Sequence, residues 1–202
     1  MAKQLKRLFS STYYKNLELY KPILADPMPP MAMRNPTFVS LFPLVTGGLA
    51  TAFLPALDMF TAYLPFITKY TCLYASFHST FQAGIHWGFA ASLHDPELHN
   101  QDSKYINMQF IYPAAVPLVT WTLNAYIWLL PFSLPRALNS IAAIGLTHVG
   151  ILVGDHFYVS RGTVPLFFKK YKILVGVVST VSILLLAFGA YMYPEKTLKK
   201  DN

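Results

Sequence analysis

The sequence predicts an all-α integral membrane protein, a bundle of about five transmembrane helices preceded by an amphipathic N-terminal extension. The first observation is composition: the 202 residues are 54% hydrophobic and 12% charged, about half the charged fraction of a soluble domain. The second is that the uncharged residues form long blocks, at 35–57, 70–94, 105–135, 137–154 and 173–194. A soluble chain of this length could not cover five such blocks from water.

Residues 1–34 are predicted to be a basic amphipathic extension that ends in a proline-rich linker. Lys3, Lys6 and Arg7 all precede the first acidic residue, Glu18. A basic, hydroxylated and acid-poor start is typical of mitochondrial targeting sequences, whereas a secretory signal needs an apolar core that this segment lacks. The alternative is a helix that lies on an anionic lipid surface.

A helix that crosses a hydrocarbon core of ~30 Å needs roughly 20 residues. The blocks therefore predict spans at about 37–58, 70–93, 107–130, 134–156 and 168–193. These spans form one predicted five-helix domain, 35–194, followed by a polar tail, 195–202. The fourth block reaches full length only if it starts at Leu134, with Arg136 extending toward the headgroups.

The distribution of Lys and Arg predicts the orientation. More of them lie on the side of the N-terminus than on the opposite side, so the positive-inside rule places the N-terminus in the matrix or cytoplasm. An odd number of spans then puts the C-terminus across the membrane. With the targeting-like start, the expectation is a multi-pass protein of the mitochondrial inner membrane, with its N-terminus in the matrix and its C-terminus in the intermembrane space.

Polar side chains are concentrated in the second and fourth predicted spans. His78, Gln82 and His86 recur every four residues and therefore share one helix face, as do His148 and Asp155, which are seven apart. Ionisable groups are costly in lipid and usually face the bundle interior. We expect the two faces to meet in an interhelical hydrogen-bond cluster, in which each bond contributes ~0.6–2 kcal/mol.

Glycine pairs lie beside these polar residues. Gly84 and Gly88 enclose Trp87 in GIHWG, and Gly150 and Gly154 close GILVG. Small residues four apart let two helices approach closely. We therefore expect the pairs, with Trp87, to form the contact between the second and fourth spans.

Two alternatives stay open for the histidines. His78, His86, His148 and His156 could ligate a haem iron or another metal between facing helices, or the cluster could line a proton or solute path. No spacing is as diagnostic as CxxCH or HExxH. The interhelical cluster is the preferred interpretation, with no metal and no cofactor expected.

Basic residues at the start of the last span are predicted to bind lipid headgroups. These residues are Arg161, Lys169, Lys170 and Lys172. Anionic phospholipids such as cardiolipin would suit this cluster. The sequence has no separate basic patch with interleaved aromatic residues, so nucleic acid is not expected as a partner.

The second predicted span resembles a known family. YASFHSTFQAGIHWGFAASL is similar to the HWG segment of the transmembrane protein 69-like family, a membrane domain of unknown function. The resemblance extends over residues 40–190, through Pro113–Trp121 to GDHFYVSRGTVPLFFKKYKILVG. By that match Asp155 is the family aspartate, and Pro165 and Lys172 belong to the turn and last helix. The first span departs from the family pattern, with only Leu41-Phe42-Pro43 as a loose counterpart. The resemblance implies a mitochondrial or bacterial membrane bundle without established catalysis.

The sequence therefore favours a non-catalytic accessory subunit of a mitochondrial respiratory-chain complex or supercomplex. Its expected contacts are the membrane, anionic phospholipids and the other subunits of the complex. No nucleophile–base pairing and no phosphate-binding glycine loop is found, and the protein is not expected to be an enzyme. The alternatives are a haem-binding redox protein and a membrane assembly factor or transporter.

Overall fold

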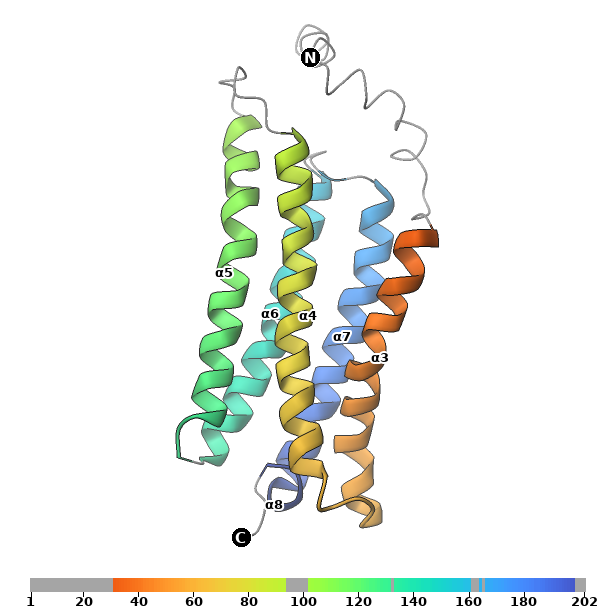
Figure 1. Cartoon of the computed structure of the whole chain (residues 1–202), viewed down its shortest axis with the longest axis vertical. Helices are drawn as coiled ribbons and strands as arrows, with labels where there is room; N and C mark the ends of the chain where they lie inside the picture. The colour runs from red at the N-terminus through yellow and green to blue at the C-terminus, as the bar shows by residue number, and fades with distance from the viewer. Residues whose placement is uncertain (1–30, 94–101, 132, 161–163, 165, 199–202) are drawn as a thin grey trace, which may run out of the picture.

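The computed structural model describes residues 31–93, 102–131, 133–160, 164 and 166–198 (Figure 1). Five long helices lie side by side: α3 (Met31–Phe53), α4 (Leu64–Leu93), α5 (Asp102–Trp128), α6 (Leu134–Ser160) and α7 (Leu166–Met192). Two short helices, η1 (Leu54–Leu57) and α8 (Pro194–Thr197), complete the described part. The all-α prediction is confirmed. Residues 1–30 of the predicted extension, and the loop between α4 and α5 (94–101), lie outside the described residues.

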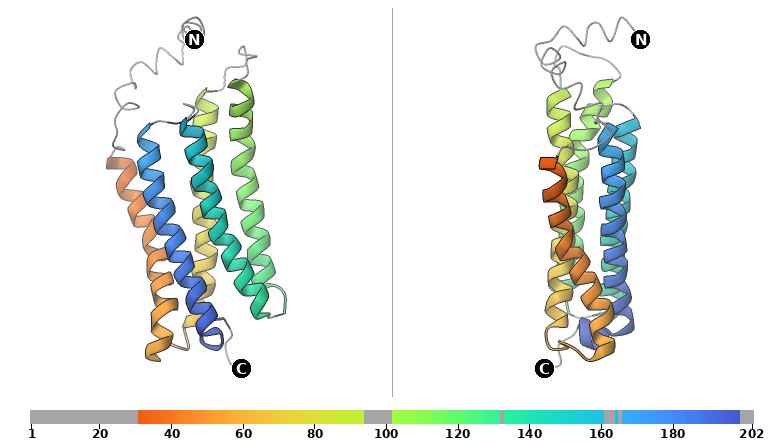
Figure 2. Two further views of the ribbon diagram at one scale, coloured as in Figure 1. Left: turned by 180° about the vertical axis from the view of Figure 1, so that it is seen from behind. Right: turned by 90° about the vertical axis from the view of Figure 1, so that its right-hand side faces the viewer.

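Four of the described helices are long and apolar enough to cross a membrane, namely α3, α5, α6 and α7. The helix α4 has 30 residues and is equally long, but polar side chains along it lower its hydropathy. It runs beside the other four in all three views (Figures 1 and 2). The sequence prediction of about five spans thus corresponds to four helices that are apolar enough to cross a membrane and a fifth, α4, of similar length packed among them.

The position of α4 explains why it tolerates polar residues. Neighbouring helices pack in the order α3, α7, α6, α5, α4 and back to α3, and α4 also contacts α6 and α7 across this ring. One side of α4 is therefore enclosed by protein rather than lipid. The main apolar core around it includes Leu44, Cys72, Ile141, Ile183 and Leu186.

The closest helix approaches involve α3, which starts at Met31 rather than at the predicted residue 37. Cβ atoms on Gly48 or Gly189 would overlap backbone atoms of α7 and α3 respectively, at Ser182 and Thr51. Because neither glycine has a Cβ, the two backbones can lie nearly in contact. This α3–α7 seam was not predicted from the sequence.

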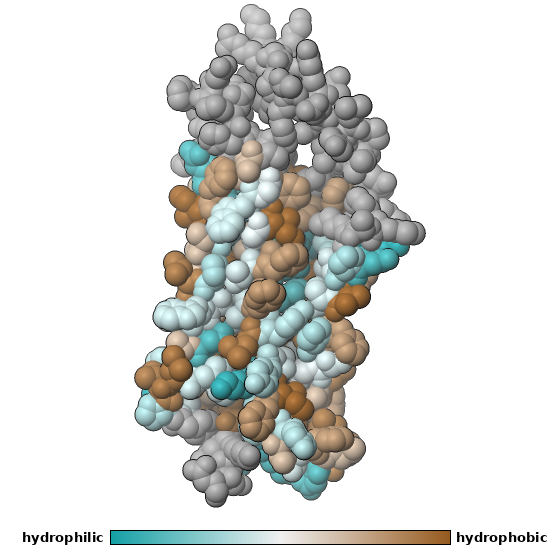
Figure 3. All heavy atoms as spheres, viewed as in Figure 1, coloured by the Kyte–Doolittle hydropathy of each residue, from teal (hydrophilic) through white to brown (hydrophobic). Residues whose placement is uncertain are grey.

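The outer surface of the bundle is largely apolar. Apolar side chains are spread over the face shown in Figure 3. Every long helix contributes a large exposed hydrophobic residue, and examples in chain order are Phe42, Phe77, Trp121, Leu146 and Leu184. An apolar surface on all five helices is what contact with lipid requires.

The described part of the predicted C-terminal tail folds back onto the bundle. Thr197 and Leu198 are buried, and Lys196 Nζ donates to the Pro55 carbonyl at 3.0 Å and pairs with Asp58. Asp58 is exposed and ends η1 in the left-handed conformation, with φ 52°. The helix α8 lies at the opposite end of the bundle from the start of α3 (Figure 1).

Candidate intramembrane polar site

A buried ion pair joins the last two long helices. Asp155 lies near the end of α6 and Lys172 near the start of α7, and Lys172 Nζ is 3.4 Å from Asp155 Oδ2. Each residue is only 2% exposed. A charge in a low-dielectric interior needs an opposite charge or several hydrogen bonds. The two residues neutralise each other about one and a half turns inside the helix ends.

His86 on α4 connects this pair to two further helices. Its Nε2 is 2.6 Å from Asp155 Oδ1, and its Nδ1 is 3.0 Å from Gln109 Nε2 on α5. The carboxylate accepts from Nε2–H, so Nδ1 is the acceptor for the Gln109 amide. Both ring nitrogens are therefore engaged, and His86 is fully buried.

Gln82 completes the environment of the lysine. Lys172 Nζ donates to Gln82 Oε1 at 2.6 Å and to the Gln82 carbonyl at 3.0 Å. Together with Asp155, these acceptors use all three ammonium hydrogens. The Asp155 carboxylate and the Lys172 ammonium are thus both paired, whereas the buried Oε1 of Gln109 has no hydrogen-bond partner among the described residues. We call Gln82, His86, Gln109, Asp155 and Lys172 the ion cluster.

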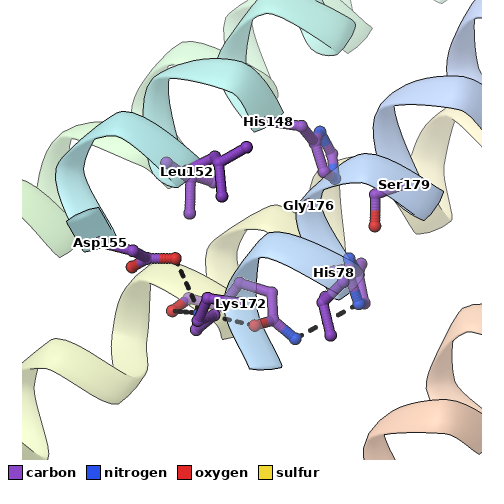
Figure 4. A pocket seen from close by; sticks show the side chains of 10 residues that line it. His78, His148, Leu152, Asp155, Lys172, Gly176 and Ser179 are labelled. Carbon is purple, nitrogen blue, oxygen red and sulfur yellow. Dashed lines mark hydrogen bonds and ion pairs between the residues drawn. The ribbon is translucent and has the colours of Figure 1, made fainter. Parts of the chain in front are cut away.

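Two histidines lie deeper in the bundle, beyond Gln82. Gln82 Nε2 is 3.4 Å from His78 Nε2, and the ring of His78 stacks on that of His148 with centroids 5.9 Å apart and planes at 6°. His148 Nδ1–H donates to the Ile144 carbonyl at 3.1 Å. A small cavity lies between these histidines and the ion cluster (Figure 4).

Aromatic rings enclose the ion cluster. The ring of His86 has those of Tyr112, Tyr158 and Phe168 around it, at centroid distances of 5.3, 5.0 and 5.9 Å. Phe168 is fully buried, and Lys172 Nζ lies 4.8 Å from its centroid. This apolar wall keeps the local dielectric low, so interactions within the cluster are strong.

The structure brings together the five polar residues that the sequence singled out, His78, Gln82, His86, His148 and Asp155. Lys172 was predicted to bind lipid headgroups, and that prediction is wrong. Its side chain points into the bundle, where the only described carboxylate beside it is Asp155. Lys169 and Lys170 are exposed as a headgroup site requires, whereas Arg161 lies outside the described residues.

The glycine prediction is wrong for three of the four positions. Added Cβ atoms on Gly84, Gly88 and Gly150 would meet no described atom within 4 Å. Gly84 follows Gln82 by two residues, and Gly150 follows His148 by two, which is roughly 200° around a helix. They therefore lie away from the polar faces. Gly154 does pack closely, but against Tyr112 of α5, 3.2 Å from its Cβ position.

The four histidines proposed as haem ligands are not assembled as a set. His156 is exposed, on a different face of α6 from His148. His86 uses both nitrogens for protein partners, and His148 Nδ1 is bonded to the backbone. Among the described residues, no three His, Cys, Asp or Glu side chains are grouped as a metal site.

Two contributors to the site were missed in the sequence, Gln109 and Ser179. Gln109 is a lone buried amide in an apolar stretch of α5, seven residues before the buried Val116. Ser179 is seven residues after Lys172, so both lie on one face of α7. In each case the seven-residue spacing places the missed residue on the same helix face as a buried one, and this was the signal available in the sequence.

Trp87 also has a role other than the predicted one. It is 48% exposed, and its Nε1–H donates to the Phe110 carbonyl of α5 at 2.7 Å. Trp87→Phe should therefore destabilise the bundle by about 0.5–1.5 kcal/mol, the value of one hydrogen bond. Detergent unfolding followed by circular dichroism would measure this. Trp121→Phe is the control, because Trp121 is 70% exposed on α5, and an equal loss there would contradict the assignment.

The fold and the site define a multi-pass membrane bundle with a buried ion cluster. A family model described as "Protein of unknown function (DUF3429)" matches residues 29–188, and the chain belongs to that family. The match includes all five long helices except the last four residues of α7, and it stops before the described tail. No curated protein and no solved structure matches the chain.

Proposed function

We propose that the protein is a non-catalytic structural subunit of a membrane assembly, in which the ion cluster locks four of the five long helices into a rigid unit that fills space between larger subunits. The single observation that carries this proposal is the closed state of the cluster. Asp155, Lys172 and His86 are 0–2% exposed and satisfy one another through hydrogen bonds from α4, α6 and α7. Such a network fixes helix positions rather than presenting groups to a substrate.

The apolar circumference supports the same proposal. All five helices expose large hydrophobic or aromatic side chains, which suits contact with lipid and with neighbouring membrane subunits. Exposed Lys169 and Lys170 at the start of α7 suit an anionic headgroup such as that of cardiolipin.

The proposed setting is a respiratory-chain complex or supercomplex of the mitochondrial inner membrane. It is supported by the basic, acid-poor start of the sequence and by the resemblance to transmembrane protein 69-like proteins. The excess of Lys and Arg on the N-terminal side supports a matrix-facing N-terminus and a C-terminus in the intermembrane space.

A second candidate is a membrane protein that moves protons or a small solute. The observation that favours it is the buried Asp155–Lys172 pair, because intramembrane ion pairs often mark translocation paths. The row of polar side chains on α4, from His86 through Gln82 to His78, would extend such a path. In purified vesicles, a proton or solute flux that Asp155→Asn abolishes would favour this candidate.

The subunit proposal is tested with the full chain, tagged and expressed at its natural level. After extraction in mild detergent, we expect it to migrate with a respiratory complex on native gels and to recover subunits of that complex in a pull-down. The double variant Lys169→Gln, Lys170→Gln should weaken retention of cardiolipin. Lys69→Gln should not, because the exposed Lys69 lies near the start of α4, at the opposite end of the bundle (Figure 1). A protein found only as a free monomer, with no respiratory subunits recovered, would overturn the proposal.

A further inference from the structure

We propose that the cavity between α4, α6 and α7 is a binding site for one internal water molecule, held by His78, His148 and Ser179. This site lies beside the ion cluster, whose Gln82, Asp155 and Lys172 also line the cavity, and it does not depend on the proposed function. The three residues proposed to hold the water come from three different helices. A bound water would therefore be a structural part of the bundle core.

The cavity has the size of one water molecule. Its volume is about 10 Å³, close to the smallest space that holds a water. His78, His148 and Ser179 lie together on one side of it, and Asp155 and Lys172 lie on the other (Figure 4). Leu152 and Gly176 also line the cavity, and a Cβ on Gly176 would lie 3.2 Å from the Leu152 side chain. The apolar walls leave room for one small polar molecule and no larger ligand.

Three buried polar atoms around the cavity have no hydrogen-bond partner among the described residues. They are His78 Nδ1, His148 Nε2 and Ser179 Oγ, on side chains that are 0–3% exposed. An unsatisfied buried polar atom costs about 1–3 kcal/mol, so three of them in one place strongly favour a bridging molecule. A water that makes about three hydrogen bonds satisfies all of them.

The donor and acceptor pattern matches water. The Nε2 atom of His78 accepts a hydrogen bond from the Gln82 amide, so the ring proton is on Nδ1. Nδ1–H is therefore a donor that needs an acceptor. His148 donates from Nδ1 to the Ile144 carbonyl, so its Nε2 is an acceptor. One water can accept from His78 and donate to His148, and Ser179 Oγ can take either role. A cation would find no free carboxylate there among the described residues, because Asp155 is already paired with Lys172 and His86.

The water would extend the hydrogen-bonded network. Without it, the chain of bonds from His86 through Asp155, Lys172 and Gln82 stops at His78. With it, the chain continues to His148 and Ser179, which gives the network a second connection among α4, α6 and α7 deeper in the bundle.

The proposal is tested by solid-state NMR of the full chain in lipid vesicles, with ¹⁵N-labelled histidine. Nitrogen shifts should show His78 and His148 protonated at Nδ1, and His86 protonated at Nε2. Magnetisation that starts on water should reach the Nδ1–H of His78 at mixing times at which the Nε2–H of His86 shows no transferred signal. Protonation of His78 at Nε2, or equal transfer to His78 and His86, would overturn the proposal.

Two serine variants on α7 give a matched comparison. Ser179→Ala removes one of the three proposed partners and should abolish the transfer from water to His78. Ser182→Ala should leave it intact, because Ser182 is also buried but donates to the Val178 carbonyl of its own helix at 2.8 Å. The same loss in both variants, or in neither, would contradict the site. The wild-type comparison of His78 with His86 decides the question if the Ser179 variant does not fold.

Discussion

Replacing Asp155 with alanine is expected to destabilise the bundle by about 3–5 kcal/mol, the largest effect of any single polar substitution in this chain. The change leaves the Lys172 ammonium buried at 2% exposure with no described carboxylate beside it, and it also removes the acceptor for His86. Unfolding of the purified protein in mixed detergent micelles, followed by circular dichroism, would measure the loss.

The matched controls concern the other half of the ion pair. Lys172→Met should cost less than Asp155→Ala, because His86 still donates to the carboxylate after the lysine is gone. The double variant Asp155→Leu, Lys172→Met should regain part of the stability, since a buried ion pair can often be replaced by apolar residues at little cost. Equal stability of Asp155→Ala and wild type would show that the pair is solvated rather than buried.

Alanine at Gly189 is expected to cost about 3 kcal/mol or more, the upper part of the range for overpacked cores. The new Cβ would overlap the backbone carbonyl of Thr51 on α3, and a backbone atom cannot rotate away as a side chain can. The helices α3 and α7 would have to separate along their shared seam. Gly48→Ala should behave in the same way, because its Cβ would meet the Ser182 carbonyl.

Gly84→Ala on α4 is the control for these glycine variants. No described atom lies within 4 Å of the position its Cβ would take, so the substitution adds no clash. It should be neutral or stabilising by up to about 1 kcal/mol, because alanine favours helix more than glycine does. The same unfolding assay would measure all three variants, and a loss in Gly84→Ala as large as in the other two would contradict the assignment of the effect to the α3–α7 seam.

The helices could be predicted because they depend on composition alone. Long uncharged blocks are enough to mark segments that suit lipid, and the predicted spans overlap the observed helices throughout the described residues. The errors lie at the ends. Residues 31–34 were assigned to the linker but lie inside α3, which also contains Pro36. Prolines are tolerated within membrane helices whose neighbours satisfy the freed backbone groups.

The polar site could be predicted only in part, because helical spacing shows which residues share a face but not what the face meets. The spacing of His78, Gln82 and His86 correctly grouped the polar side of α4. The same spacing rule, applied to Gly84, would have shown that it lies on the other side. A glycine pair marks a possible close approach, but whether a helix occupies it depends on tertiary packing.

Lys172 illustrates what a one-dimensional pattern leaves out. A basic residue six positions into a membrane helix is within reach of headgroups, and its neighbours Lys169 and Lys170 do point outward. Only the opposing position of Asp155 on α6 makes an inward orientation more favourable. Long-range pairing between helices decided the role of this residue.

The ion pair between α6 and α7 also bears on how the protein is made. Inserting either helix alone would put an unpaired charge into the bilayer, and because both residues lie near helix ends the cost is below the ~2.5–3.5 kcal/mol of a charge at the bilayer centre. Because the two helices are consecutive in the chain, Asp155 and Lys172 can neutralise each other as soon as both have left the insertion machinery. The natural unit of biogenesis is therefore the helical hairpin of α6 and α7. The helix α4, which carries the partner His86, precedes this hairpin in the chain.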